Sequence, residues 1–288
     1  MAKSITEQKS LLSQLSERRI HSEYPKELSI VAEGDSWFNY PYRMDVIDHL
    51  IKDGYAINNL SKYGDTLENI IYGNGFTKTR TKLVHHGPIS LQLILSTIKR
   101  IKPSFFLFSA GGNDVVGEGL VNYLNHKNAG GELVNKTIFT EKLKAMKGAL
   151  SFLIESIERV HPFCHILMDG YDYAKVNGKG YEFLGIELKG PWIEPSFAAK
   201  AIINGDDQKE IISFLVDDFN SLLKELDATY PNFHYIDLRN EFPHENSWDN
   251  EIHLKSAGYR RVADLYNEKI NDVMGFVPIS EFKERIIV

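Results

Sequence analysis

The stretch LSIVAEGDSW, from Leu28 to Trp37, decides the fold class of this chain. Its first half, Leu28–Ala32, is almost continuously apolar, which is typical of a parallel β-strand buried on both faces. The strand leads into Glu33-Gly34-Asp35-Ser36, so Ser36 falls on the turn that follows it. In open α/β folds this turn lies at the carboxyl edge of the sheet, where ligands bind. Taken alone, Gly-Asp-Ser is also common in ordinary turns and caps.

Four further runs have the same apolar character and predict the rest of a parallel sheet. They are Tyr55–Leu60, Phe105–Ser109, His165–Met168 and Phe233–Leu238. Amphipathic helical patterns separate the runs, at Met44–Lys52, Ile89–Ile101, Thr140–Val160, Asp207–Tyr230 and Ser256–Met274, and another opens the chain at residues 4–20. Thr140 and Ser256 are the expected N-caps of their helices. This alternation predicts an α/β fold with a central parallel sheet of about five strands, and residues 1–288 as one domain.

Two long segments interrupt the alternation and are candidate lids or substrate loops. Residues 115–139 are rich in glycine and asparagine, and residues 171–205 place Tyr171, Trp192 and other aromatic side chains among glycines and prolines. The plainer alternative is that both are packed surface excursions. Because the segments follow the third and fourth predicted strands, we favour a role in binding.

Composition and charge narrow the classes of partner. The formal net charge is −6 and the sequence pI is about 5.9, which argues against nucleic acid as the main partner because phosphate binding needs a basic face. Cys164 is the only cysteine, so no intrachain disulfide can form, and its apolar neighbours predict a buried side chain. The chain shows no secretory signal and no apolar run long enough for a membrane span. We therefore expect a cytoplasmic protein.

Polar residues also follow the other predicted strands. Gly64 comes after the second strand, Gly111-Gly112-Asn113-Asp114 after the third, and Asp249-Asn250-Glu251-Ile252-His253 after the fifth. Each signal is weak by itself, since turn glycines and loop histidines are usually structural. Together with Ser36 they supply a hydroxyl nucleophile, two candidate oxyanion donors and an imidazole base, which is the set of groups that acyl transfer needs.

In these blocks the sequence resembles the SGNH, or GDSL-like, hydrolases, whose blocks are Gly-Asp-Ser, a glycine, Gly-x-Asn-Asp and Asp-x-x-His. The resemblance extends from about Leu28 to about Met274. It implies a three-layer α/β/α sandwich of the flavodoxin-like kind, and hydrolysis of esters without a cofactor or metal. It also implies that Ser36 attacks the acyl carbon, while the Ser36 and Gly64 backbone N–H groups and the Asn113 side chain hold the oxyanion.

The fourth block departs from the family pattern, because Asn250 stands three residues before His253, where the family has Asp. Three residues could orient the histidine: Asp249 through a shifted turn, Asn250 itself, or a carboxylate from elsewhere such as Asp237. Asparagine can fix the ring but cannot offset its charge. We favour Asp249, because a buried imidazolium without a counter-charge is costly.

The sequence thus predicts an esterase or acylhydrolase, with a deacetylase as one form, that works through an acyl-enzyme on Ser36. We expect His253 to take the serine proton, and Trp37, Tyr171 and Trp192 to contact a small-molecule or glycan ester. Asp35 and Asp114 are expected to brace their turns. The alternatives are an acyltransferase that uses the same residues and, because of the Asn at the Asp position, a catalytically weak binding module.

Overall fold

The computed structural model describes residues 28–73, 76–78, 83–85, 87–183 and 186–275. Its centre is a five-stranded, all-parallel sheet with the strand order β2-β1-β5-β6-β9. The strands are β1 (Ser29–Gly34), β2 (Ala56–Asn59), β5 (Phe105–Ser109), β6 (His165–Asp169) and β9 (Phe233–Ile236). These are the five strands that the apolar runs predict, so the predicted α/β fold is confirmed.

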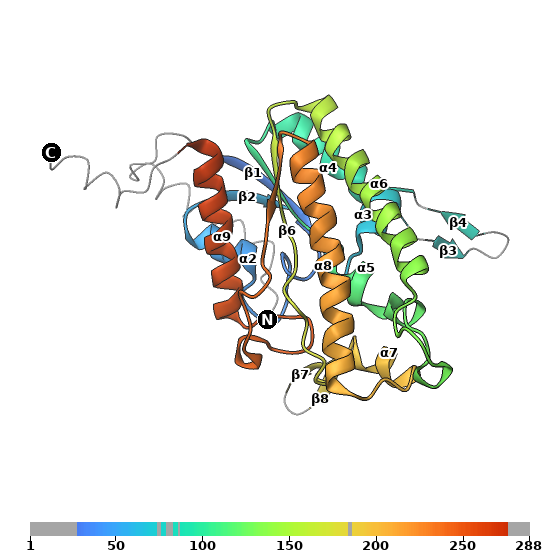
Figure 1. Cartoon of the computed structure of the whole chain (residues 1–288). Helices are drawn as coiled ribbons and strands as arrows, with labels where there is room; N and C mark the ends of the chain where they lie inside the picture. Colours follow the sequence, from blue (N-terminus) through green and yellow to red (C-terminus); the bar gives the residue numbers. More distant parts are fainter. Residues whose placement is uncertain (1–27, 74–75, 79–82, 86, 184–185, 276–288) are drawn as a thin grey trace, which may run out of the picture.

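Helices cover both faces of the sheet and make three layers (Figure 1). One face carries α2 (Val46–Lys52) and α9 (Ser256–Met274), which pack on each other. The other carries α3 (Leu67–Tyr72), α4 (Ile89–Ile101), α6 (Lys136–Val160) and α8 (Gly205–Thr229). In α9 the buried side chains recur at helical spacing, from Tyr259 through Val262 and Tyr266 to Ile270, so one stripe of the helix faces the core.

Two expected helix caps were wrong. α6 begins a turn earlier than predicted, with Asn135 as the N-cap whose side chain accepts the N–H of Ile138. The earlier start adds buried Phe139 to the apolar stripe of the helix, and Thr140 lies inside it. Ser256 is the first residue of α9 rather than its cap, because its hydroxyl lies 3.2 Å from Nε2 of His49 instead of bonding the helix backbone. The helix expected at residues 4–20 lies outside the described residues.

The two irregular segments contain short elements that the sequence patterns did not predict. The first contains η1 (Glu118–Asn122) and η2 (Lys127–Ala129), and α5 (Gly112–Val116) runs into its start. The second contains the antiparallel strands β7 (Tyr181–Phe183) and β8 (Ile186–Lys189) and the helix α7 (Glu194–Ala199). A hairpin of β3 (Phe76–Lys78) and β4 (Leu83–His85) and the turn η3 (Glu245–Ser247) are further additions. In Figure 1, β7, β8 and α7 gather at the lower end of the molecule, beyond the carboxyl ends of the strands.

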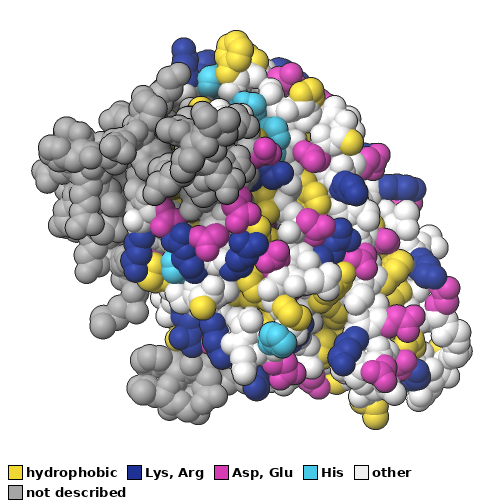
Figure 2. Space-filling model, turned by 60° about the vertical axis from the view of Figure 1, so that its left-hand side comes forward, with side chains coloured by type: hydrophobic (Ala, Val, Ile, Leu, Met, Phe, Trp, Pro, Cys, Tyr) yellow, Lys and Arg dark blue, Asp and Glu magenta, His cyan; other side chains and the backbone are white. Residues whose placement is uncertain are grey.

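One face of the surface shows how the charged side chains are distributed, and the cysteine is buried as the sequence predicts. On the face drawn in Figure 2, basic and acidic side chains are interspersed and do not separate into a broad basic patch. Within the described part of the chain, every helix is too short or too polar to cross a lipid bilayer. Cys164 is buried, and burial raises the pKa of its thiol to about 12.

Candidate active site

The turn that carries Ser36 is held by backbone and side-chain bonds. Strand β1 runs so close to β5 that a Cβ on Gly34 would lie 2.5 Å from the carbonyl oxygen of Ser109, which explains the glycine. The Asp35 carboxylate accepts the Trp37 backbone N–H at 2.9 Å and the Tyr171 hydroxyl at 2.7 Å. Asp35 therefore braces the turn, as expected, and fixes the direction in which the Ser36 side chain leaves it.

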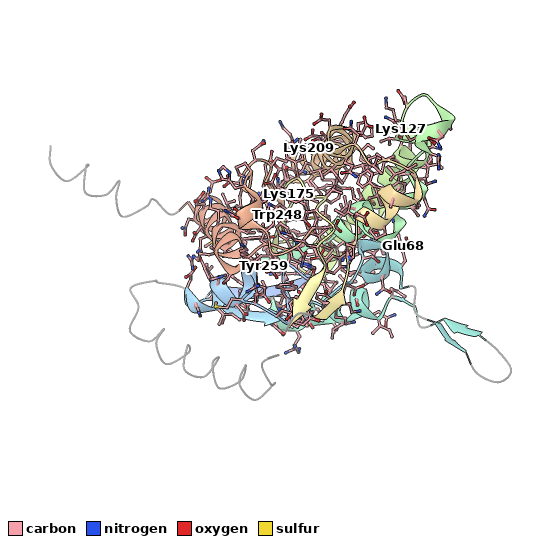
Figure 3. The ribbon with its side chains drawn as sticks, turned by 90° about the horizontal axis from the view of Figure 1, so that it is seen from below. Glu68, Lys127, Lys175, Lys209, Trp248 and Tyr259 are labelled. Carbon is pink, nitrogen blue, oxygen red and sulfur yellow. The ribbon has the colours of Figure 1, made fainter. Side chains whose placement is uncertain are left out.

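His253 lies beside Ser36 although 217 residues separate them in the chain: its Nε2 is 2.8 Å from Ser36 Oγ. A bridge between Trp248 and Leu254 closes the loop that carries the histidine, and the Asp249 backbone N–H donates to the His253 carbonyl at 2.8 Å. In Figure 3, which views the molecule from below, Trp248 lies beside Lys175, whose Nζ is 5.6 Å from the Trp248 ring centroid. This closed loop, residues 248–254, holds the imidazole against the serine hydroxyl.

Asn250 is the residue that bonds the other ring nitrogen, with Oδ1 2.9 Å from His253 Nδ1. The same Oδ1 accepts the backbone N–H groups of Ile252 at 3.2 Å and His253 at 3.0 Å. Backbone N–H groups can only donate, so the atom that faces them must be the amide oxygen. His253 Nδ1 must then carry the proton, which leaves Nε2 bare to accept the hydroxyl proton of Ser36.

Neither carboxylate considered as an alternative contacts the ring. Asp249, the residue favoured from the sequence, instead binds Arg43 at 2.5 Å and accepts the Tyr40 hydroxyl at 3.3 Å. Closure of the 248–254 loop turns the Asn250 side chain inward, so the position three residues before the histidine faces the ring. Asp237 pairs with Arg239 at 2.6 Å.

Burial and missing counter-charge decide the electrostatics of His253. The residue is 1% exposed, and burial lowers the pKa of its imidazole to about 3. The Tyr40 ring stacks on the imidazole at a centroid distance of 4.4 Å, and the Trp192 ring lies nearly perpendicular to it at a centroid distance of 5.0 Å. The ring is therefore neutral at physiological pH, which is the form that a general base needs.

The two further candidate oxyanion donors lie on one cleft. Gly64 has a φ of +75°, a conformation that favours glycine, and Asn113 lies in the first turn of α5. The Asn113 amide donates to the Asp65 carbonyl at 2.8 Å, which fixes its orientation. Asp114 beside it accepts the Leu67 backbone N–H at 2.7 Å and Lys142 Nζ at 3.0 Å, so it braces the turn as expected.

The cleft has a volume of about 830 Å³ and opens between the two irregular segments. Its lining combines Gly64 and Asn113 with Tyr63, Thr66, Gly119, Val121, Lys189, Gly190, Pro191, Trp192, Pro195 and Ser196. Of the three residues expected to contact substrate, Trp192 is the one that lines this cleft. Trp37 and Tyr171 lie in the core instead, packed edge to face at 5.0 Å, because the Trp37 indole N–H donates to Ile252 and the Tyr171 hydroxyl to Asp35.

Glu251 is a residue of the site that sequence reasoning missed. Its buried carboxylate accepts the backbone N–H groups of Gly178, Trp192, Ile193 and Glu194 at 2.6–3.2 Å. The 248–254 loop is thereby tied to segment 171–205. An acidic residue in a polar loop reads as solvent-exposed, so no sequence signal marks this contact.

A second missed group lies behind the serine turn. The Asp169 carboxylate accepts the Tyr266 hydroxyl at 2.6 Å and the Ser109 hydroxyl at 3.2 Å. Burial raises the pKa of Asp169 to about 8 and that of Asp35 to about 7.

Over the described ranges, no cluster of three or more His, Cys, Asp or Glu side chains is arranged to hold a metal ion.

Two solved lipases have a similar architecture. The lipase Lip_vut3 from a goat rumen metagenome superposes with a TM-score of 0.54 at 15% identity, over 84% of this chain and 96% of that one. An extracellular lipase from Streptomyces rimosus superposes with a TM-score of 0.51 at 14% identity, over 84% and 99%. No family model and no curated protein matches the sequence. The likeness shows the fold alone: the chain has the three-layer α/β/α architecture of these two lipases.

Proposed function

We propose that this protein is a serine esterase that cleaves a carboxylic ester through an acyl-enzyme on Ser36. The observation that carries the proposal is the 2.8 Å contact between Ser36 Oγ and His253 Nε2, in the tautomer that Asn250 imposes. Nε2 has a free lone pair in this tautomer, so it can remove the hydroxyl proton as Oγ attacks the acyl carbon.

The remaining steps use groups of the same edge of the sheet. The Ser36 and Gly64 backbone N–H groups and the Asn113 amide hold the oxyanion of the tetrahedral intermediate. His253 then gives its proton to the leaving alcohol, and afterwards takes a proton from the water that attacks the acyl-enzyme. Asn250 keeps Nδ1 in place throughout, as asparagine does in Cys-His-Asn enzymes.

The cleft supports a small-molecule or glycan ester as the substrate. Its lining brings Tyr63 and Trp192 together with polar Thr66 and Ser196 and with Lys189, a mixture that suits a substrate with both apolar and hydroxyl groups. The lipases with the same fold act on esters as well, which supports the reaction class.

The test is hydrolysis of p-nitrophenyl esters of increasing acyl length by the wild-type protein and by Ser36→Ala. We expect turnover in the wild type and a loss of about a thousandfold or more in the variant. Equal turnover in both proteins would contradict the proposal. Absence of turnover in both would favour the binding module that Asn250 suggested, and faster ester consumption when an alcohol is added, with the acyl group on that alcohol, would favour the acyltransferase.

A further inference from the structure

Four residues form a continuous chain of hydrogen bonds that starts at the His253 ring and ends at Asp249. Asn250 Oδ1 lies 2.9 Å from His253 Nδ1, and Asn250 Nδ2 lies 3.3 Å from the Tyr40 hydroxyl. That hydroxyl lies 3.3 Å from Asp249 Oδ2. We propose that Asp249 is a positioning residue which acts on His253 at a distance, through Tyr40 and Asn250. The inference rests on the proposed function of His253 as the base.

The direction of every bond in this chain is forced. Two backbone N–H groups fix Asn250 Oδ1 toward the ring, so Asn250 Nδ2 must face Tyr40 and donate to its hydroxyl oxygen. The Tyr40 proton is then free to point at Asp249, which can only accept as a carboxylate. All the donors thus point from the histidine toward the carboxylate, and bonds aligned in this way polarise and strengthen one another.

Tyr40 is held so that it can serve as the link. Its backbone N–H donates to Asp45 Oδ2 at 3.0 Å, and its ring lies flat on the His253 imidazole. Burial, and then the Asp249 charge, raise the pKa of its hydroxyl well above the ordinary value, so Tyr40 keeps its proton. An ionised tyrosine could not donate to Asp249, and the chain would break at this residue.

Asp249 can carry a negative charge where Asn250 cannot. Its side chain is 10% exposed and pairs with Arg43, which is 46% exposed, so the ion pair sits at the rim of the buried site. When His253 takes the Ser36 proton, the imidazolium strengthens its hydrogen bond to Asn250. The hydrogen bonds from Asn250 to Tyr40 and from Tyr40 to Asp249 then strengthen as well. The only proton that changes owner is the one that moves from Ser36 Oγ to His253 Nε2.

Other titratable groups also lie around these four hydrogen-bonded residues. Tyr63, Tyr181 and Tyr259 surround Tyr40, and the pKa of each is raised, chiefly by burial. Arg43 stays charged, and Glu251 is engaged with the backbone of segment 171–205. Asp45 accepts the Tyr40 backbone N–H and not its hydroxyl, so Asp249 is the carboxylate that polarises these hydrogen bonds.

The experiment compares Tyr40→Phe, Asp249→Asn and the double variant with Tyr42→Phe as the matched control. Tyr42 meets the Tyr40 ring edge to face at 5.4 Å, but its hydroxyl takes no part in the chain. We expect each single variant to lower kcat about three- to tenfold, with KM changed less than about twofold. The double variant should be no slower than the slower single one, because both changes break one chain. Tyr42→Phe should keep the wild-type kcat.

Two further measurements separate positioning from general damage. In an Asn250→Asp background the histidine has a carboxylate beside it, so Tyr40→Phe should cost less than about twofold. In ¹⁵N-histidine-labelled protein near neutral pH, Tyr40→Phe and Asp249→Asn should both move the resonance of the His253 Nδ1 proton upfield, because its hydrogen bond weakens. This signal needs no substrate, and its loss in His253→Gln assigns it.

Wild-type kcat in Tyr40→Phe and Asp249→Asn, with an unmoved Nδ1 proton resonance, would overturn the inference. Losses that multiply in the double variant would overturn it too, because they would mean two independent effects. The proposed function fails in a different way: a fluorophosphonate would then leave Ser36 unlabelled in the wild type, whatever the histidine resonance does.

Discussion

The Glu251 carboxylate accepts the backbone N–H of Trp192 at 2.6 Å, and this bond joins the loop that holds His253 to the segment that lines the cleft. The Trp192 ring in turn meets the His253 imidazole at 5.0 Å. One buried acid therefore sets the distance between the proposed base and the wall of the cleft.

Glu251→Gln should weaken this junction. The glutamine amide has one oxygen acceptor, and its N–H₂ group would face backbone N–H groups that also donate. Some of the four backbone N–H groups that now donate to Glu251 would then have no acceptor. We expect urea unfolding to show a loss of about 1–3 kcal/mol in the free energy of unfolding, and steady-state kinetics to show a raised KM as Trp192 shifts. Glu245→Gln, at an exposed acid just before the same loop, is the control. Unchanged stability in Glu251→Gln would mean that the acid contributes nothing to the junction.

Asn113→Ala tests the oxyanion donor. Loss of one such donor costs about 100- to 1000-fold in kcat in enzymes of this kind. We expect a fall of that size with little change in KM, measured on a p-nitrophenyl ester, because the amide acts on charge that develops after binding. A change confined to KM would show instead that Asn113 only binds the substrate.

The pH dependence of kcat/KM tests the environment of His253. Burial lowers its pKa to about 3, so the base stays unprotonated, and kcat/KM should stay level as the pH falls from about 7 to about 5. Asn250→Asp places a negative charge beside Nδ1, which favours the imidazolium and raises the pKa. In that variant the acid limb should move up toward the ordinary value near 6.5. Asn246→Asp, in the exposed part of the same region, should leave the limb in place.

A half-maximal kcat/KM near pH 6.5 in the wild type would show that His253 has a counter-charge in solution.

The low pKa of His253 also affects the stability of the folded protein. As the pH falls below about 6.5, His253 is protonated in the unfolded chain but stays neutral in the folded chain. The contribution of the neutral His253 to stability is therefore present above about pH 6.5 and is lost as the pH falls toward about 3.

The contribution of the buried Asp169 to stability changes with pH in the opposite direction to that of His253. Burial raises its pKa to about 8, against about 3.9 in an unfolded chain. Its contribution to stability is fully present below about pH 4 and is lost as the pH rises through about 8. Asp169→Asn cannot ionise, so its melting temperature should improve relative to the wild type as the pH is raised from 5 to 8. Asp206→Asn, at an exposed acid, should show no such trend, and a pH-independent difference in Asp169→Asn would show that Asp169 does not titrate.

The sheet could be predicted because strands buried on both faces read as continuous apolar runs, and all five runs became strands. Ser36 and His253 could be placed at one edge for the same reason, since each follows a strand. The start of α6 could not be placed, because Asn135 and Thr140 are both acceptable caps in sequence. Burial of Phe139 decides between them.

Contacts over long sequence separations explain what the sequence missed in the site. Asp249 and Asn250 are equally near His253 along the chain, and the bridge from Trp248 to Leu254 decides which of them faces the ring. Tyr40 lies 209 and 210 residues from the partners of its hydroxyl, so no local pattern points to it. Trp37 and Tyr171 were expected to contact substrate, but both are buried, and hydrogen bonds to Ile252 and Asp35 hold them in the core.

The most direct test of the account is covalent labelling of the nucleophile. The wild-type protein and Ser36→Ala are incubated with a fluorophosphonate probe, and the labelled peptides are identified by mass spectrometry. Ser36 is 3% exposed but lies 2.8 Å from a neutral imidazole, so we expect one adduct, on Ser36, in the wild type. Ser36→Ala should remain unlabelled at a nearly unchanged melting temperature. Label on a different serine of the wild-type protein, with Ser36 unmodified, would contradict the account.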